Sequence, residues 1–114
     1  MEEKISGEIV FESRKEKGWT VWALSGSMNV NTSTKAEEAG KKILASTEKL
    51  AIDLAGLKYL SSAGLRVFMR FGKQAKKEGK NCVLVSAKGI VADVLKESKI
   101  DMVIPVKKSM EELD

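Results

Sequence analysis

The sequence predicts an α/β fold in which parallel strands are joined by a crossover helix. Two short apolar runs, at residues 50–54 and 81–85, have the β-rich composition of strands that are buried on both faces. Residues 62–78 between them repeat apolar side chains with a helical period, and Gly79 supplies a stop signal. We therefore expect a strand–helix–strand unit over residues 50–85.

The chain is expected to open with a β-hairpin. Its strands are predicted over residues 8–12 and 20–24, and the polar stretch between them ends in Gly18, which can adopt the positive φ of a hairpin turn. Trp19 and Trp22 are an odd number of residues apart, so they should point to opposite faces of the sheet. One tryptophan is then expected in the core, and the other exposed or covered by a neighbouring segment.

A loop and a helix are predicted to follow. Residues 25–34 lack a period and are rich in Ser, Asn, Thr and Gly, which indicates a loop that ends in a helix cap near residues 32–34. A helical pattern begins at Lys35, where Glu37 and Lys41 have the spacing of a favourable ion pair within one helix. The predicted inner face carries mostly small residues: Ala36, Ala39, Gly40 and Ile43.

The last third of the chain should add a helix over residues 89–98, a short edge strand over residues 103–106 and a final helical turn. Ser86 is a candidate cap for the helix. Ser109 and Glu112 have capping-box spacing for the final turn. The helix is expected to turn four apolar side chains inward: Ile90, Val91, Val94 and Leu95.

Composition narrows the class of protein. The 114 residues, 43% hydrophobic and 32% charged, suit one globular domain over residues 1–114. The chain has no histidine and one cysteine, Cys82, which argues against hydrolases with Ser-His-Asp or Cys-His sites, against histidine phosphotransfer and against an internal disulfide. No segment approaches the roughly 20 apolar residues that cross a bilayer. We expect a cytoplasmic protein with no membrane contact and no cofactor.

Ser61 and Ser62 stand where a strand, a short connection and a helix meet, and three roles are open to a hydroxyl there. A serine oxygen at a helix start can accept hydrogen bonds from unpaired backbone N–H groups, which is a structural cap. The same N–H groups and the helix dipole favour an anion, so the position also suits a phosphorylated serine. A catalytic nucleophile needs a base; Lys58 is a candidate, but no motif supports it.

A basic stripe marks the outer face of the helix that begins at Ser62. The net charge of +4 is compatible with binding of nucleic acid or of an acidic protein surface, and equally with a solvated face. The absence of nearby aromatic residues for base stacking argues against direct nucleic-acid binding. The residues of the stripe recur at helical spacing: Arg66, Arg70, Lys73 and Lys77.

Residues 52–68, IDLAGLKYLSSAGLRVF, closely resemble the signature of the STAS domain of bacterial anti-sigma factor antagonists. In that family a strand ending in D-L-x-x-[LV] leads to a helix start of the form D/S-S-[SA]-G-L. The segment from Gly26 to Asn29 resembles the family's G-E-L-D motif, and Thr32 falls where a threonine or serine often follows. The resemblance extends over about residues 7–109.

The resemblance implies a single α/β domain whose mixed sheet has about five strands, with helices packed against it. It further implies a protein without enzymatic activity that binds an anti-sigma factor and so releases a sigma factor. In the phospho-regulated members the anti-sigma factor is a serine kinase, and a phosphatase reverses the modification. Matching the motifs places the phosphoacceptor at Ser62, with Ser61 as the competing acceptor.

The partner-binding surface that the resemblance implies combines one loop with one helix start. We expect it to consist of Asn29, Asn31, Thr32, Ser61, Ser62, Ala63, Gly64 and Arg66. Ser61 and Asn29 replace acidic residues of the family's pattern, which lowers the negative charge around the acceptor. The alternative is a STAS scaffold module of a signalling or transport assembly, bound without phosphorylation. A monomer is the expected state.

Overall fold

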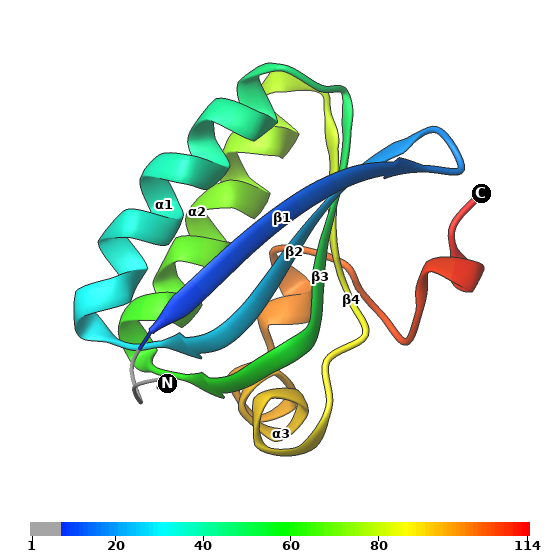
Figure 1. The fold of residues 1–114 in the computed structure, drawn as a ribbon. Helices are drawn as coiled ribbons and strands as arrows, with labels where there is room; N and C mark the ends of the chain where they lie inside the picture. The colour runs from blue at the N-terminus through cyan, green and yellow to red at the C-terminus, as the bar shows by residue number, and fades with distance from the viewer. Residues whose placement is uncertain (1–7) are drawn as a thin grey trace.

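The computed structural model describes residues 8–114 as a five-stranded mixed sheet with helices against one of its faces (Figure 1). β1 and β2 are antiparallel, and every later neighbour is parallel. The predicted α/β class is confirmed. The strands follow one another in chain order: β1 (Ile9–Glu16), β2 (Trp19–Met28), β3 (Lys49–Leu60), β4 (Asn81–Val85) and β5 (Val106–Lys107).

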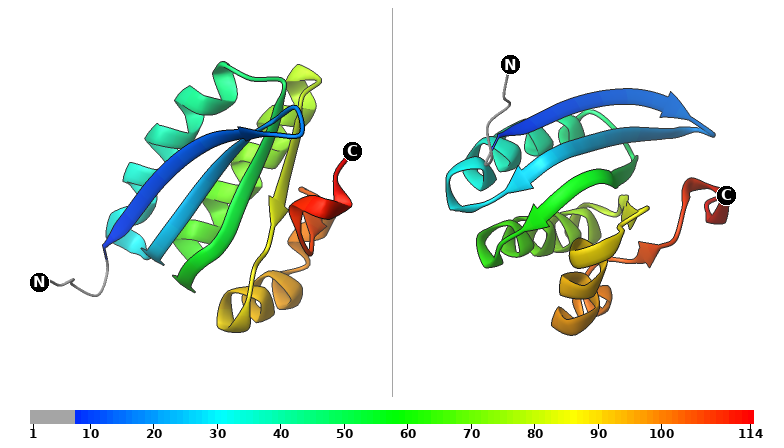
Figure 2. Two further views of the ribbon diagram at one scale, coloured as in Figure 1. Left: turned by 45° about the vertical axis from the view of Figure 1, so that its right-hand side comes forward. Right: turned by 60° about the horizontal axis from the view of Figure 1, so that its bottom comes forward.

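Helices α1 (Val30–Ala45) and α2 (Ser62–Glu78) run side by side on one face of the sheet, and α3 (Gly89–Ser98) lies near the end of β3 and β4 (Figures 1 and 2). Two short 3-10 turns follow, η1 (Ile100–Met102) and η2 (Met110–Glu112). The segment that carries η2 reaches the face of the sheet opposite the helices, as the two views of Figure 2 show.

The two faces of the sheet are buried in different ways, and the two tryptophans show it. Trp22 lies in the main core beneath the helices, with its ring centroid 5.5 Å from that of Phe11 and 6.0 Å from that of Phe71. Trp19 points to the other face, where Met110 and Leu113 of the C-terminal segment cover it. The predicted opposite orientation is therefore confirmed, and Trp19 is the one covered by a neighbouring segment.

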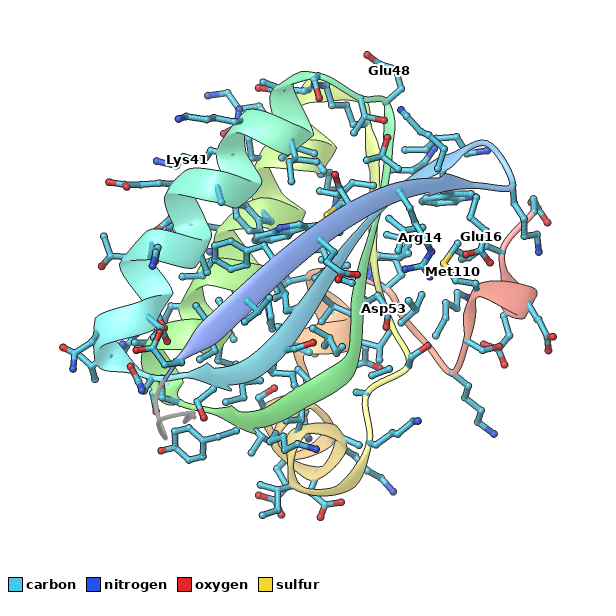
Figure 3. All side chains as sticks on the ribbon, in the orientation of Figure 1. Arg14, Glu16, Lys41, Glu48, Asp53 and Met110 are labelled. Atoms are coloured by element: carbon cyan, nitrogen blue, oxygen red, sulfur yellow. The ribbon has the colours of Figure 1, made fainter. Side chains whose placement is uncertain are left out.

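The predicted hairpin is confirmed, but its strands are longer than expected. Residues 13–16, expected in the connection, belong to β1, and only Lys17 and Gly18, with φ of 58° and 85°, form the turn. The polar side chains were compatible with a strand because β1 is a sheet edge and exposes most of them. Arg14 donates hydrogen bonds to Glu16 at 3.1 Å and to Asp53 of β3 at 3.4 Å. Figure 3 labels the three side chains.

The loop predicted over residues 25–34 is wrong, because β2 continues to Met28 and α1 begins at Val30. Ser25 and Gly26 lie at register shifts between β2 and β3, and Gly26 has a φ of 101°. A strand that contains such irregularities lacks the regular alternation by which strands are recognised. The helix cap is Asn29 rather than a residue near 32–34.

The strand–helix–strand prediction is confirmed, with a longer first strand. β3 runs through to Leu60, whereas the sequence predicted a strand that ended near Leu54. α2 has the predicted bounds, and Gly79 ends it in the left-handed conformation with a φ of 72°. β3 and β4 are parallel neighbours, as expected for a crossover connection.

Several details of the last third were wrong. α3 has the predicted bounds, but its Ile90 is 64% exposed, and Lys88 rather than Ser86 occupies the cap position. The final strand is β5, which begins three residues later than expected. Ser109 makes no side-chain cap for η2; instead Glu112 accepts a hydrogen bond from the Lys108 N–H at 3.0 Å.

The described residues give two further observations on the class of protein. No helix in residues 8–114 combines the length and the apolar character needed to span a bilayer. Cys82 is buried in β4, and desolvation raises the pKa of its thiol to about 12. A thiol with that pKa stays protonated at neutral pH and is a poor nucleophile.

Candidate functional site

The candidate site is formed where β2 and β3 end side by side. Met28 pairs with Leu60 in the last register position of the two strands, and the Ser61 N–H donates to the Met28 carbonyl at 2.9 Å. Each strand leads almost directly into a helix, so the N-termini of α1 and α2 lie at the same end of the sheet (Figure 1). The two motifs of the sequence are thereby brought together.

Ser61 is the N-cap of α2. Its backbone is extended, with φ of −87° and ψ of 172°, and its hydroxyl oxygen accepts a hydrogen bond from the Gly64 N–H at 3.2 Å. The Ser61 carbonyl accepts the first helical hydrogen bond, from the Leu65 N–H at 2.9 Å. The structural role that was open to either serine therefore belongs to Ser61.

Ser62 is the first residue of α2, and its side chain is exposed. Its hydroxyl makes no hydrogen bond to any residue between 8 and 114, so a modification there would break none of the bonds in that part of the chain. The unpaired N–H groups of the first helical turn lie beside it. Neither α1 nor α2 carries an acidic residue in its first turn, so no carboxylate of these turns competes for the positive ends of the two helix dipoles.

The two serines are expected to differ in their effect on stability. Ser61→Ala removes the cap and should lower the free energy of unfolding by about 1 kcal/mol, whereas Ser62→Ala should change it by less than about 0.5 kcal/mol. Urea unfolding of both variants, with circular dichroism as the readout, measures the difference. Equal losses for the two variants would contradict the assignment of the cap to Ser61.

The start of α1 is held by a reciprocal capping box. The Asn29 side-chain oxygen accepts hydrogen bonds from the N–H groups of Asn31 and Thr32, both at 2.9 Å. The Thr32 hydroxyl accepts from the Asn29 N–H at 2.9 Å and donates to the Ser27 carbonyl at 2.8 Å. Asn29 and Thr32 are half-buried, so these two residues fix the shape of the rim, while the Asn31 side chain is exposed on it.

Gly64 brings the start of α2 close to the ends of both strands. A Cβ atom at this position would lie 2.7 Å from Leu60 Cδ1 and 2.8 Å from Met28 Cγ, closer than side chains pack. Gly64 is itself buried, so its place in the predicted partner surface is below that surface. Ala63 is half-buried and Arg66 is exposed, one helical turn beyond Ser62.

Two exposed apolar side chains at this end of the sheet were missed by sequence reasoning. Val30, the first residue of α1, is 73% exposed, and Tyr59, next to the last residue of β3, is 48% exposed. Val30 directly follows Asn29 of the predicted surface, and Tyr59 precedes Ser61 of that surface by two residues. No alternation signals Tyr59, because β3 ends with two consecutive exposed residues, Lys58 and Tyr59, between the buried Leu57 and Leu60.

No group of three or more His, Cys, Asp or Glu side chains in residues 8–114 is placed to hold a metal ion. What the site does offer is an exposed hydroxyl at a helix start, a second helix start beside it, and a rim of polar and apolar side chains. This arrangement suits protein recognition and modification of the serine.

Comparison with known proteins shows which family this chain is similar to. The STAS domain family model matches residues 6–113. The chain is 33% identical over 101 residues to BtrV of Bordetella bronchiseptica, which carries the name of an anti-sigma factor antagonist, with 85% of this chain and 84% of BtrV covered.

Solved structures share the fold. The crystal structure of an anti-sigma factor antagonist from Mycobacterium paratuberculosis matches with a TM-score of 0.80 at 23% identity, covering 92% of this chain and 90% of that one. The antagonist SpoIIAA in its unphosphorylated form matches with a TM-score of 0.72 at 12% identity, covering 90% and 91%. Bacillus SpoIIAA in its phosphorylated form matches at 0.66 and 11%, covering 90% and 95%. With a family match over nearly its whole length and a helix start that carries the motif, this chain belongs to the STAS domain family.

Proposed function

We propose that this protein binds an anti-sigma factor of the serine kinase type, that this binding releases a sigma factor, and that reversible phosphorylation of Ser62 controls it. The partner contacts the rim described above, from Asn31 on α1 to Arg66 on α2, with Val30 and Tyr59 as apolar anchors. A phosphatase restores the binding form. The protein itself is a regulator and not an enzyme, as is usual for antagonists of its family.

One observation carries the proposal: Ser61 and Ser62 have different roles at the start of α2. The Ser61 hydroxyl accepts a hydrogen bond from the Gly64 N–H, while Ser62 presents an exposed hydroxyl at the same helix start. A kinase can therefore reach Ser62 without dismantling the cap that holds α2. Ser61 is a poor second acceptor, because its phosphorylation would disturb that cap.

The helix start makes phosphorylation tolerable to the fold. A phosphate adds about −1.5 to −2 charges, and the positive end of the α2 dipole with its free N–H groups stabilises such an anion. The bound partner meets the opposite situation, because docking over Ser62 would bury the dianion. The modification should therefore act on binding and leave the fold nearly unchanged.

The similar proteins named above also support this proposal. BtrV carries the name of an anti-sigma factor antagonist, and the fold of this chain is shared with SpoIIAA, known in an unphosphorylated and a phosphorylated form. A fold that has been solved in both states accommodates a phosphate. The departure at Ser61 and Asn29 from the acidic pattern of the family removes like charges from the neighbourhood of that phosphate.

Binding of the purified protein to an anti-sigma kinase from the same cell tests the proposal. We expect a direct binary complex without ATP, and loss of that complex when ATP and magnesium are added. Size-exclusion chromatography and calorimetry measure both results. A partner that lacks a kinase fold and binds equally with and without ATP would support the scaffold alternative instead.

A further inference from the structure

A second surface lies on the helical side of the molecule, between the C-terminal halves of α1 and α2. We propose that this α1–α2 groove, an open cleft of about 590 Å³, docks an acidic helical segment of a protein partner. This docking is separate from the partner contact proposed around Ser62. Six charged side chains line the groove: Glu37, Lys41, Arg70, Lys73, Lys77 and Glu78.

The carboxylate of Glu37 is already paired with an arginine of the same molecule. Glu37 of α1 accepts two hydrogen bonds from the Arg70 guanidinium of α2, Nε to Oε2 at 2.6 Å and the second at 2.8 Å. These bonds hold the pKa of the Glu37 carboxyl below its usual range. Within residues 8–114 Glu37 thus forms its hydrogen bonds across the groove with Arg70, and Lys41, the partner that the helical spacing predicted, adds only a Coulombic attraction.

The second carboxylate is engaged as well. Glu78 accepts a hydrogen bond from the Gln74 side chain and pairs with Lys80 at 3.4 Å. The hydrogen bond from Gln74, followed by that from Lys80, lowers the pKa of the Glu78 carboxyl. Both acidic groups of the groove therefore already have partners on the molecule itself.

Three lysines remain available. Lys41, Lys73 and Lys77 are exposed, and none of them makes a hydrogen bond or an ion pair with another residue of the described chain. Lys73 and Lys77 are one helical turn apart on α2, and Lys41 extends from α1 away from the sheet (Figure 3). Lys41 attracts Glu37 and Lys77 attracts Glu78 through Coulombic interaction alone, so the ammonium groups on both walls of the groove keep their hydrogen-bond donors for a partner.

The floor of the groove is apolar. Leu44 and Ala45 on α1 and Phe71 on α2 line it between the charged side chains. The two helices can approach here because Gly40 has no side chain; a Cβ atom there would lie 2.5 Å from Phe71 Cζ. An amphipathic helix with carboxylates beside an apolar stripe matches both features, since its acids reach the lysines and its stripe covers Ala45, the exposed part of a floor in which Leu44 and Phe71 are each 2% exposed.

Nucleic acid fits the groove less well than an acidic helix. Phe71, the aromatic residue among those lining it, is only 2% exposed and provides no stacking platform. The paired carboxylates Glu37 and Glu78 interrupt the row of lysines, so the groove lacks the continuous line of cations that a phosphate backbone requires. The observations therefore favour a protein segment.

The groove is independent of the phosphoacceptor. Lys73 and Lys77 follow Ser62 by 11 and 15 positions in one helix, which places them about 16 Å and about 22 Å from it along the α2 axis. At those distances the charges of exposed groups are largely screened at physiological salt. Phosphorylation of Ser62 should therefore leave binding in the groove unchanged.

The test uses a fluorescent synthetic helix of roughly 14 residues, about four turns, with glutamates flanking a leucine stripe. We expect it to bind the wild-type protein at low salt and to shift the backbone NMR signals of the residues that line the groove. The triple variant Lys41→Glu/Lys73→Glu/Lys77→Glu should bind roughly tenfold more weakly or worse. The matched triple Lys88→Glu/Lys96→Glu/Lys108→Glu, with the same change of net charge at exposed positions elsewhere, should bind like wild type.

Each other outcome has a defined meaning. Absence of binding, equal losses in the two triple variants, or signal shifts confined to the Ser62 end would overturn the proposal. Equal binding of a peptide with lysines in place of the glutamates, or tighter binding of a single-stranded oligonucleotide, would do the same. If the variant Lys41→Glu/Lys73→Glu/Lys77→Glu does not fold, the single variants Lys73→Glu and Lys73→Gln replace it. Lys73→Glu should then lose more affinity for the peptide than Lys73→Gln. Ser62→Asp should bind the acidic peptide normally, which separates this surface from the proposed anti-sigma contact.

Discussion

Replacing Ser62 by aspartate is expected to weaken binding of the anti-sigma factor by about a thousandfold, or about 4 kcal/mol, because the partner must desolvate a charge that it does not pair. The stability of the fold should change little, since an acidic group at the first position of α2 interacts favourably with the helix dipole. Isothermal titration with the purified partner measures the loss, and thermal unfolding measures the fold.

Ser62→Asn is the matched control for this variant. Asparagine has nearly the size of aspartate without its charge, so we expect the Ser62→Asn variant to retain most of the affinity. If both variants lose affinity equally, size rather than charge governs the contact, and a phosphate switch based on charge is excluded. A large drop in melting temperature for Ser62→Asp would point instead to a structural role for the residue.

Gly26→Ala should be the most damaging single-atom change in the sheet, lowering the free energy of unfolding by about 3 kcal/mol. The φ of 101° at Gly26 is one that alanine rarely adopts, at a cost of roughly 1–2 kcal/mol. The added Cβ would also lie 2.3 Å from the Glu8 carbonyl oxygen, a backbone atom that cannot swing away. Such overpacking adds roughly 1–3 kcal/mol. Urea unfolding gives the value.

Gly79→Ala isolates the contribution of the backbone angle. Gly79 also has a positive φ, 72°, but a Cβ there would meet no atom within 4 Å. Its replacement should therefore cost only about 1 kcal/mol. Equal losses at Gly26 and Gly79 would mean that the close approach of β2 to the Glu8 carbonyl is unimportant for stability.

The sequence predicted the bounds of β4 and α2 better than those of β2. β4 and α2 have the predicted bounds because their apolar residues recur with the period of a buried strand and of an amphipathic helix. The second half of β2 was missed because Ser25 and Gly26 interrupt that period at register shifts. Tertiary pairing with β3 fixes this strand, and no local pattern reports it.

The candidate site was predictable as a location but not in the roles of its residues. The motif brought attention to Ser61 and Ser62, yet adjacent serines have the same chemistry. Their roles separate only through backbone conformation, which gives Ser61 the cap and makes Ser62 the first helical residue. Tyr59 and Val30 were missed because an exposed apolar residue at a strand or helix end carries no periodic signal.

The α1–α2 groove was out of reach for a different reason. The stripe on α2 was visible in the sequence, but the pairing of Glu37 with Arg70 joins residues 33 positions apart. Helical spacing favoured Lys41 as the partner of Glu37; Lys41 does attract Glu37, but the packing of the two helices shows that Arg70 makes the hydrogen bonds. Charge patterns along one helix predict neighbours within that helix and not across a groove.

The measurement that tests the central claim most directly is mapping of phosphate on the protein after incubation with its anti-sigma kinase and ATP. Mass spectrometry of the peptides should find one phosphate at Ser62 in the wild-type protein and in Ser61→Ala, and none in Ser62→Ala. A phosphate on Ser61, or an unmodified protein in the presence of an active kinase that binds it, would contradict the claim that Ser62 is the switch.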